Sequence, residues 1–493
     1  MRNANLSGMT SGILKLPMVI ASCVCVSTGA GNCIAADTNA QTTEVSAAAA
    51  VSSTAWGQYS MPFAADSLWN SRPVAPVFGT FVIPKSDYFP SISEGKWSTG
   101  VFLSSASDGP VTVTGLPGGK GLWDPDAEAF HDVTIPRWPA NVIPASGADG
   151  HADVVDPIAG RVHSFYQLKF QDGRWTASQY AWSRIDGRGW GDPAHYFQGA
   201  RASGVPTMAG LIRKHEVQDG RPMYSHALAM ALTFNALSQK PSYVYPATSA
   251  DTGAATTNSG VIPEGALLML PPSYDTQQIA DLDLRKVAET LKVYGAYVVD
   301  RNHGTPFAIY VENGSGFNLH KNGWNSAVAS ELNKIRQSLR QVISASGFLD
   351  GNGRRFEPAR NLNLLSMRGP WDIQSGTTPG TFDTWTQSIV FPATSTRTVM
   401  VNNSSRGLNA VSWSTPPSGV QYRLAVTATN GARMQFQIVD RAIGKKVFDS
   451  GELGDGQSST FAWPASNAAI TVYAMSGVGS GSTVRGELLR IDQ

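Results

Sequence analysis

Cysteine is almost absent from the chain, and its position limits the chemistry available to the mature protein. The only three cysteines, Cys23, Cys25 and Cys33, lie within the first 36 residues. This segment has two basic residues and no acidic one, an apolar run over residues 16–30, and small residues at 33–36. These features predict a signal peptide cleaved after Ala35 or Ala36. We therefore expect a secreted protein, extracellular or periplasmic, without disulfides, thiolate metal ligands or a cysteine nucleophile.

An alternative reading retains one of these cysteines. Residues 19–23, Val-Ile-Ala-Ser-Cys, resemble a bacterial lipobox, in which Cys23 would be acylated and would anchor a lipoprotein. In either case the apolar run is shorter than the roughly 20 residues needed to span a bilayer. No other segment reaches that length, so we expect no membrane span.

Charge is also scarce, and neither sign predominates. Charged residues make up 15% of the chain, against roughly 25% in an average soluble protein. The balance is 38 basic to 37 acidic residues, without a basic block. Nucleic-acid binders usually carry a basic stripe, so we expect no nucleic-acid partner. Nothing in the sequence indicates an oligomeric state.

Several motifs with well-defined chemistry are missing. There is no HExxH metalloprotease motif, no P-loop, no GxSxG elbow and no dinucleotide fingerprint. No two of the eight histidines stand three or four apart as a ligand pair on one helix. The sequence therefore predicts neither a cofactor nor a metal site.

The chain is rich in residues that favour strands and turns, with 49 Gly, 29 Pro and 13 Trp. Short apolar runs alternate with Gly, Pro and Asp turns, which predicts a mainly β protein. We expect a β-sandwich or jelly-roll-like main domain with a few packing helices, and a C-terminal β-sandwich accessory domain. The predicted parts are a signal peptide (1–36), a flexible linker (37–55), the catalytic β-rich domain (56–365), a second linker (366–379) and the accessory domain (380–493).

Two helices are predicted within the main domain. Apolar residues repeat with helical spacing from Leu284 to Leu291, with Asp283 as the N-cap and Gly295 after the end. A second stripe extends from Val328 to Val342 and is closed by Gly347. Both patterns are typical of helices that pack on a sheet.

The densest polar segment is Asp149-Gly-His-Ala-Asp-Val-Val-Asp-Pro157. Residues two apart on a strand share a face, so Asp149, His151 and Asp153 would project together, with Asp156 at the following turn. Carboxylates beside an imidazole can tune it for proton transfer. The alternative is a solvated acidic edge strand that ends in an Asp-Pro turn.

A second candidate site lies between residues 213 and 232. Alternation places His226 on one face with Leu228, Met230 and Leu232, as a core histidine or as the floor of a cleft. Glu216 precedes it by ten residues across a turn and is the glutamate best placed to reach it. Arg213 and Glu216 are three apart on what we expect to be a short helix, where a surface ion pair means little.

Aromatic residues supply candidate sugar platforms. Trp175, Trp182 and Trp190 surround a segment rich in Arg and Gly, and sugar rings stack on aromatic faces. The alternative is an ordinary β-sheet core. Asp300 ends an expected strand over residues 296–299 and is either a catalytic acid or a turn residue.

Several of these segments occur together, in the same order, in a large group of secreted, largely uncharacterised bacterial β-rich proteins that the chain resembles. They are SLWN (67–70), DGHADVVDP, RASGVPTMAGLIRKHEV, HALAMAL, PEGALLML (263–270) and YGAYVVD (294–300). The resemblance covers roughly residues 60–315. The chain departs from the group at residues 245–249, Tyr-Pro-Ala-Thr-Ser, where the group tends to have Trp-Pro-Ala-Arg-His. Members often carry attached carbohydrate-binding modules, so the resemblance implies extracellular work on glycans.

Three hypotheses for function follow. In the first, the chain is an endo-acting glycoside hydrolase on a polysaccharide, with Glu216 as acid, Asp149 or Asp156 as base, and His151 and His226 tuning them. In the second, it is a lyase on a uronate-containing polymer, with His151 or His226 as base, Tyr166 as acid and Arg213 neutralising the uronate. In the third, it is a glycan-binding surface protein without catalysis.

Overall fold

The computed structural model describes residues 56–365, 367–402, 408–409, 411–465 and 467–491. The predicted signal peptide, the lipobox cysteine and the 37–55 linker lie outside these residues. Strands hold 34% of the chain and helices 8%, which confirms the mainly β prediction. The helices are α1 (Ala254–Thr257), α2 (Leu282–Val293) and α3 (Ser326–Ser338).

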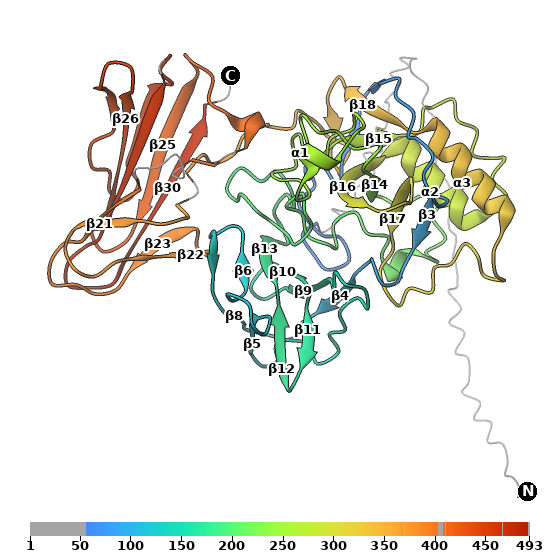
Figure 1. Cartoon of the computed structure of the whole chain (residues 1–493), viewed down its shortest axis with the longest axis horizontal. Coiled ribbons are helices and arrows are strands. Elements are labelled where there is room, and N and C mark those ends of the chain that lie inside the picture. The colour runs from blue at the N-terminus through green and yellow to red at the C-terminus, as the bar shows by residue number, and fades with distance from the viewer. Residues whose placement is uncertain (1–55, 366, 403–407, 410, 466, 492–493) are drawn as a thin grey trace, which may run out of the picture. The chain divides into compact units, whose positions relative to one another are not determined.

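The main region contains a mixed seven-stranded sheet, whose strands lie near α2 and α3 (Figure 1). Its order is β2 (Val77–Phe78), β18 (Arg340–Ser344), β15 (Leu267–Met269), β16 (Ala296–Asn302), β14 (Leu228–Thr233), β17 (Phe307–Tyr310) and β3 (Ser91–Ser93). The central strands β14 and β16 run parallel, with Leu228 opposite Ala296 and Ala231 opposite Asp300. Equivalent ends of these two strands therefore lie at the same edge of the sheet.

Both faces of β14 are buried, and its large and small side chains alternate between the two faces. Leu228, Met230 and Leu232 share a core cluster with residues of α2 and α3, while Ala229 and Ala231 pack in a second cluster with Trp69 and Trp190. The predicted alternation along this strand is confirmed. Its alanine face is covered by protein as well, and the small side chains make room for the two tryptophans.

The helices begin and end differently from the prediction. The N-cap of α2 is Asp281, whose side chain accepts a hydrogen bond from the Leu284 N–H, and not Asp283. The second predicted stripe does not stay helical to Val342. α3 ends at Ser338, and residues Arg340–Ser344 become β18 because they pair with β15 and β2. The β-branched Val342 and Ile343 favour this extended state.

The main region holds three further sheets. A six-stranded sheet has the order β4 (Gly100–Leu103), β9 (Ala152–Asp156), β10 (Arg161–Tyr166), β13 (Gln179–Arg184), β6 (Trp123–Asp124) and β7 (Ala129–Phe130). A four-stranded sheet has β11 (Lys169–Gln171), β12 (Arg174–Ala177), β5 (Val111–Gly115) and β8 (Val133–Ile135). The third contains β1 (Arg72–Pro73), β19 (Phe348–Leu349) and β20 (Arg355–Phe356).

The C-terminal strands form two five-stranded sheets. One has β21 (Asp372–Ser375), β24 (Val399–Asn402), β29 (Ala468–Met475), β26 (Arg433–Asp440) and β27 (Lys445–Asp449), and the other has β22 (Thr381–Asp383), β23 (Ser388–Phe391), β30 (Ser482–Arg490), β25 (Gln421–Ala428) and β28 (Ser458–Ala462). Alternate residues of β25 and β26, such as Leu424 and Phe436, meet in one apolar cluster, as in a β-sandwich. Leu364, Leu365 and Met367 belong to the same cluster. The domain boundaries stay a prediction.

Candidate functional site

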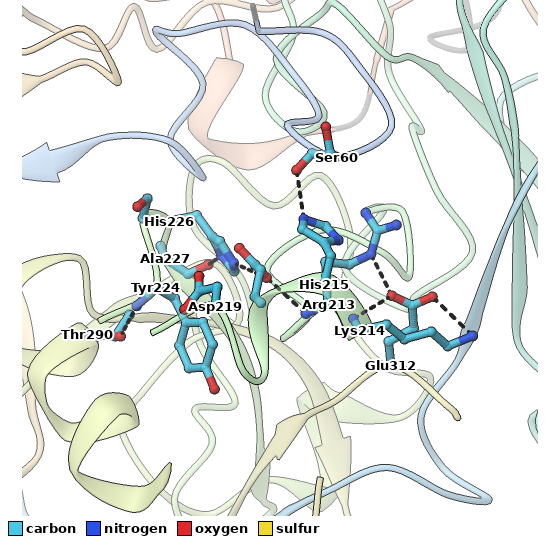
Figure 2. Close-up of polar contacts among 12 residues, drawn as sticks. Ser60, Arg213, Lys214, His215, Asp219, Tyr224, His226, Ala227, Thr290 and Glu312 are labelled. Atoms are coloured by element: carbon cyan, nitrogen blue, oxygen red, sulfur yellow. Dashed lines mark hydrogen bonds and ion pairs between the residues drawn. The ribbon is translucent and has the colours of Figure 1, made fainter. Parts of the chain in front are cut away.

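A cavity of about 360 Å³ opens beside the segment 213–226. Figure 2 shows polar residues of this region and their hydrogen bonds. The lining residues are Trp56, Ser60, Met61, Pro62, Phe63, Trp69, Asn70, Met208, Gly210, Leu211, Arg213, His215, Glu216, Asp219, Arg221, Ser225 and His226. The pocket therefore combines aromatic and aliphatic walls with charged groups, and it contains three of the predicted site residues.

Glu216 and His226 form a close ion pair in this pocket. Glu216 Oε2 lies 3.1 Å from His226 Nε2 and also accepts the Arg213 backbone N–H at 2.9 Å. In the short 3₁₀ turn Lys214–Glu216, the Glu216 side chain folds back to the backbone of Arg213, the residue before the turn. His226 Nδ1 lies 2.8 Å from the Ala227 carbonyl oxygen, so both ring nitrogens face acceptors and the imidazolium form fits best.

The charges of this pair oppose the role predicted for Glu216. Burial alone would raise the pKa of Glu216, but the His226 charge and its hydrogen bond outweigh burial and hold that pKa at about 2. Burial would lower the pKa of His226, but the Glu216 carboxylate raises it above its ordinary value. Glu216 is thus a fixed carboxylate without a proton to donate, which argues against its assignment as the general acid.

Arg213 is already neutralised by another residue. Its Nε donates to Glu312 Oε2 at 2.8 Å, its Nη1 donates to the Tyr59 carbonyl at 3.0 Å, and its guanidinium lies over the Tyr59 ring. The side chain is only 3% exposed. Its main ionic partner is therefore Glu312, within the protein. Glu312 is not among the residues predicted for the site.

The predicted site residues fall into two groups that the sheet separates. Asp300 pairs with Ala231 on β14, and His226 stands five positions before Ala231. β14 begins at Leu228, and the three strand residues from there to Ala231 span roughly 10 Å. Because Asp149 interacts electrostatically with Asp300 and Arg201, it belongs to the Asp300 end of these strands and not to the pocket. The predicted convergence of Asp149 and His151 with Glu216 and His226 is not seen.

At the Asp300 end, two carboxyl groups from distant segments meet. The Arg301 backbone N–H lies 2.8 Å from Asp251 Oδ2 and 3.0 Å from Asp300 Oδ1. Burial, the Asp300 charge and a hydrogen bond with Asp300 raise the pKa of Asp251 to about 7, although Arg301 opposes the shift. Asp251 and Asp300 are 20% and 18% exposed, so both side chains remain accessible to solvent. The pair can hold one proton near neutral pH.

Other residues fix this pair in place. Arg201 Nη1 donates to Asp300 Oδ2 at 2.9 Å, and the Tyr310 hydroxyl donates to the same oxygen at 3.2 Å. The Arg201 side chain is 1% exposed, and its Nε and Nη2 have no hydrogen-bond partner among the described residues. Behind Asp251, the fully buried Glu264 accepts the Asp251 N–H, and its pKa is raised well above the ordinary value by burial and the Asp251 charge.

Three predicted residues lie around this carboxyl pair. Burial and the Asp300 charge raise the pKa of Asp149, with Arg201 opposing, while burial and the Asp149 charge raise that of Tyr166. The His151 ring lies 5.5 Å from the Tyr166 ring, and its Nδ1 is 3.2 Å from the Phe165 carbonyl. Burial and the Arg201 charge lower the pKa of His151 to about 3, so this histidine is neutral.

The predicted common face of Asp149, His151 and Asp153 does not form, because β9 begins only at Ala152 and Gly150 turns the chain with φ +46°. Asp153 is buried instead, and it accepts hydrogen bonds from Thr207 Oγ1 and the Met208 N–H, each at 2.7 Å.

Asp156 has a structural role in a turn and an ion pair. It is buried, lies 2.8 Å from Arg137 Nη2, and accepts the backbone N–H groups of Ile158 and Ala159. Burial would raise its pKa, but the hydrogen bonds from Arg137 and the backbone lower it. These contacts occupy the carboxylate and oppose its prediction as a catalytic base.

The tryptophans predicted to bind sugar rings lie largely in the hydrophobic core. Trp182 is 6% exposed and packs on the His195 ring, while Trp190 is 1% exposed and stacks on Trp69 with centroids 5.4 Å apart. Trp175 is half-buried between Trp138 and Phe170. Burial leaves neither Trp182 nor Trp190 a free face for a sugar ring, so the alternative reading as sheet core describes them better.

Sequence reasoning missed Asp251, Arg201, Tyr310 and Glu264 as members of one cluster. Arg201 stands in the quoted RASGVP segment, but nothing in the residue pattern linked it to Asp300. Asp251 follows the segment where the chain departs from the group it resembles. Among the described residues, no group of three or more His, Cys, Asp or Glu side chains is arranged to hold a metal ion. None of the described helices has the length and hydrophobicity needed to cross a membrane.

Comparison with known proteins gives no family. No family model and no curated protein matches the chain. Among solved structures, a glycosylation-associated protein complex from Streptococcus agalactiae is similar over 22% of this chain and 37% of its own, at 14% identity and a TM-score of 0.17. The enzymatically active domain of bacteriophage CBA120 tailspike protein 4 is similar over 24% of this chain and 19% of its own, at 16% identity and a TM-score of 0.18.

A family 29 carbohydrate-binding module is similar over 26% of this chain and 86% of its own, at 8% identity and a TM-score of 0.16. The chain thus spans little more than a third of the first of these structures. At such low TM-scores the similarities carry no argument about function.

Proposed function

We propose that the chain is a secreted polysaccharide-degrading enzyme that hydrolyses glycosidic bonds at the Asp251–Asp300 pair. The observation that carries the proposal is the convergence of these two solvent-accessible carboxyl groups on the single Arg301 N–H. Glycoside hydrolysis requires a carboxylic acid that still holds its proton and a second carboxylate that activates water or attacks the sugar. This cluster supplies both kinds of group.

Asp251 is the general acid in this proposal. Its pKa of about 7 keeps a proton available at neutral pH, as a leaving-group oxygen requires. Asp300 is the positioning carboxylate, because Arg201 and Tyr310 hold one of its oxygens while the other faces the Arg301 N–H. Asp149, which interacts with Asp300 electrostatically, is the base or nucleophile. Glu216 has no proton to give and is left out of the mechanism.

A lyase is the second candidate, and one observation favours it. His151 is neutral, its Nδ1 faces a carbonyl, and Tyr166 lies beside it, so the pair resembles a base and an acid for proton abstraction at C5. The nearby carboxylates of Asp149 and Asp300 would repel the uronate that a lyase needs. Arg201 offsets only part of that repulsion, so hydrolysis is the better-supported reaction.

One experiment separates the candidates. The mature protein is incubated with a panel of neutral and uronate-containing polysaccharides, and both new reducing ends and ultraviolet absorbance from unsaturated sugars are measured. Hydrolysis predicts reducing ends without absorbance, and a lyase predicts both. Retention on insoluble glycan with neither product would support the third, non-catalytic hypothesis. Asp300→Asn serves as the impaired variant, and Asp132→Asn, an exposed acid outside the cluster, is its matched control.

Secretion is tested on the same preparations. Mass spectrometry of protein from the culture medium should find a chain that starts at Ala36 or Asp37 and has no titratable thiol. A lipid-modified Cys23 would instead support the lipoprotein alternative.

A further inference from the structure

The cavity beside Glu216 is separate from the carboxyl pair and has its own chemistry. Its volume of about 360 Å³ lies within the range of small-molecule sites. Neither Asp251 nor Asp300 lines it, so it does not hold the bond at which Asp251 would act. A ligand in this cavity therefore has a role other than presenting the cleaved bond.

The charged groups on its wall offer both acceptors and donors. Glu216 Oε2 is occupied by Arg213 N–H and His226, but its Oε1 accepts no hydrogen bond from the described residues. Arg213 Nη2 and Trp69 Nε1 are buried donors without a partner among the described residues. Unmet donors and acceptors of this kind are costly unless another molecule pairs with them.

The remaining wall is apolar and partly aromatic. Trp56 and Met61 are partly exposed at its edge, and Phe63 and Leu211 are buried behind them. Aromatic faces pack against the C–H faces of sugar rings, while hydroxyl groups both donate and accept hydrogen bonds. A sugar presents both an apolar face and hydroxyl groups, and so it matches the two parts of this wall.

We propose that this cavity binds one neutral sugar residue, with hydroxyls on Glu216 and Arg213 and the ring against Trp56. A neutral sugar is preferred over a uronate because His226 is already paired with Glu216 at 3.1 Å and Arg221 with Asp219 at 3.9 Å, so neither cation is left free for a ligand carboxylate. Arg213 does not reverse this preference, because Glu312 already neutralises it at 2.8 Å. The inference does not depend on hydrolysis at Asp251.

Saturation-transfer NMR on the full mature chain tests the site. The probes are glucose, galactose and mannose, each at millimolar concentration, with glucuronate and galacturonate as acidic counterparts of the same ring. We expect transfer to at least one neutral hexose, and binding at least fivefold weaker for its uronate. Trp56→Ala should weaken hexose binding about tenfold or more. Trp324→Ala, which removes a 64% exposed tryptophan outside the cavity, should leave it unchanged.

Two further variants are measured, one in the cavity wall and one at the proposed general acid. Met61→Ala removes a second, partly exposed part of the wall, should also weaken binding, and replaces Trp56→Ala if that protein does not fold. Asp251→Asn should bind the hexose as the unmodified protein does, so a failure of the hydrolase proposal leaves this one standing. The inference is overturned if no hexose shows transfer, if the uronates bind more tightly, or if neither wall variant weakens binding.

Discussion

Asp251 and Asp300 accept hydrogen bonds from the same group, the Arg301 backbone N–H, at 2.8 and 3.0 Å. One N–H cannot compensate two carboxylates, and burial limits the help that water can give. The second oxygen of Asp300 is held by Arg201 and Tyr310. For Asp251, the cation that pairs with it is the Arg301 guanidinium, which is more distant at 3.8 Å. Protonation of Asp251 therefore relieves the repulsion between the two carboxylates at the lowest free-energy cost. This raises the pKa of Asp251 to about 7.

This relationship predicts how stability depends on pH. Because the pKa of Asp251 is about 7 when folded and roughly 3.9 when unfolded, the folded state holds an extra proton between these values. Its contribution to stability falls as pH rises through this window, by up to about 1.4 kcal/mol per pH unit. Asp251→Asn should reduce the dependence and stabilise the protein at pH 8, while the raised pKa values of Asp149 and Glu264 keep part of it. Chemical denaturation from pH 4 to 8 checks this against Asp132→Asn, and equal slopes in all three proteins would contradict it.

A second prediction concerns the Glu216–His226 pair. Glu216→Gln leaves the imidazolium without its anion, so the pKa of His226 should fall and the protein should lose about 1–3 kcal/mol of stability. NMR titration of the His226 ring and thermal unfolding measure the two effects. Glu331→Gln is the control, because it breaks only a surface pair with Lys334 that contributes little. An unchanged His226 pKa would show that the two side chains do not interact in solution.

A third prediction concerns the C-terminal boundary. Leu364, Leu365 and Met367 pack in the core of the C-terminal sheets, although they precede the expected accessory domain. A chain that ends near Thr378 would keep these side chains but remove their partners, and would expose apolar surface. A chain that ends at Arg360 should therefore stay monodisperse at higher concentration in size-exclusion chromatography. Greater solubility of the longer truncation would place the boundary after residue 378.

Local patterns predicted much of the fold. The alternation in residues 228–232, the helical repeat from Leu284 to Leu291 and the alternating strands of the C-terminal region all record which side chains face a core. The pattern failed at Val342, where pairing with neighbouring strands overrides the helical stripe. It also failed at Asp149, because Gly150 interrupts the strand alternation.

The candidate site was predicted only in part. Glu216 and His226 were recognised as neighbours because a short turn joins them, but their charges were misjudged, since an ion pair sets them only once the chain is folded. Asp251 and Asp300 belong to segments that meet solely through the tertiary fold, as do Arg201 and Tyr310. The spacing of these residues along the chain does not indicate that they lie close together in the fold.

The central claim is that Asp251 supplies the catalytic proton, and the pH dependence of turnover by Asp251→Asn tests it most directly. On the polysaccharide that the panel identifies, the unmodified enzyme should lose kcat/KM as pH rises above about 7, where Asp251 releases its proton. Asp251→Asn should be slower by about 10²-fold or more, the usual scale of general acid–base catalysis, and should lack this decline. Turnover within threefold of the unmodified enzyme, with the same decline above pH 7, would contradict the account.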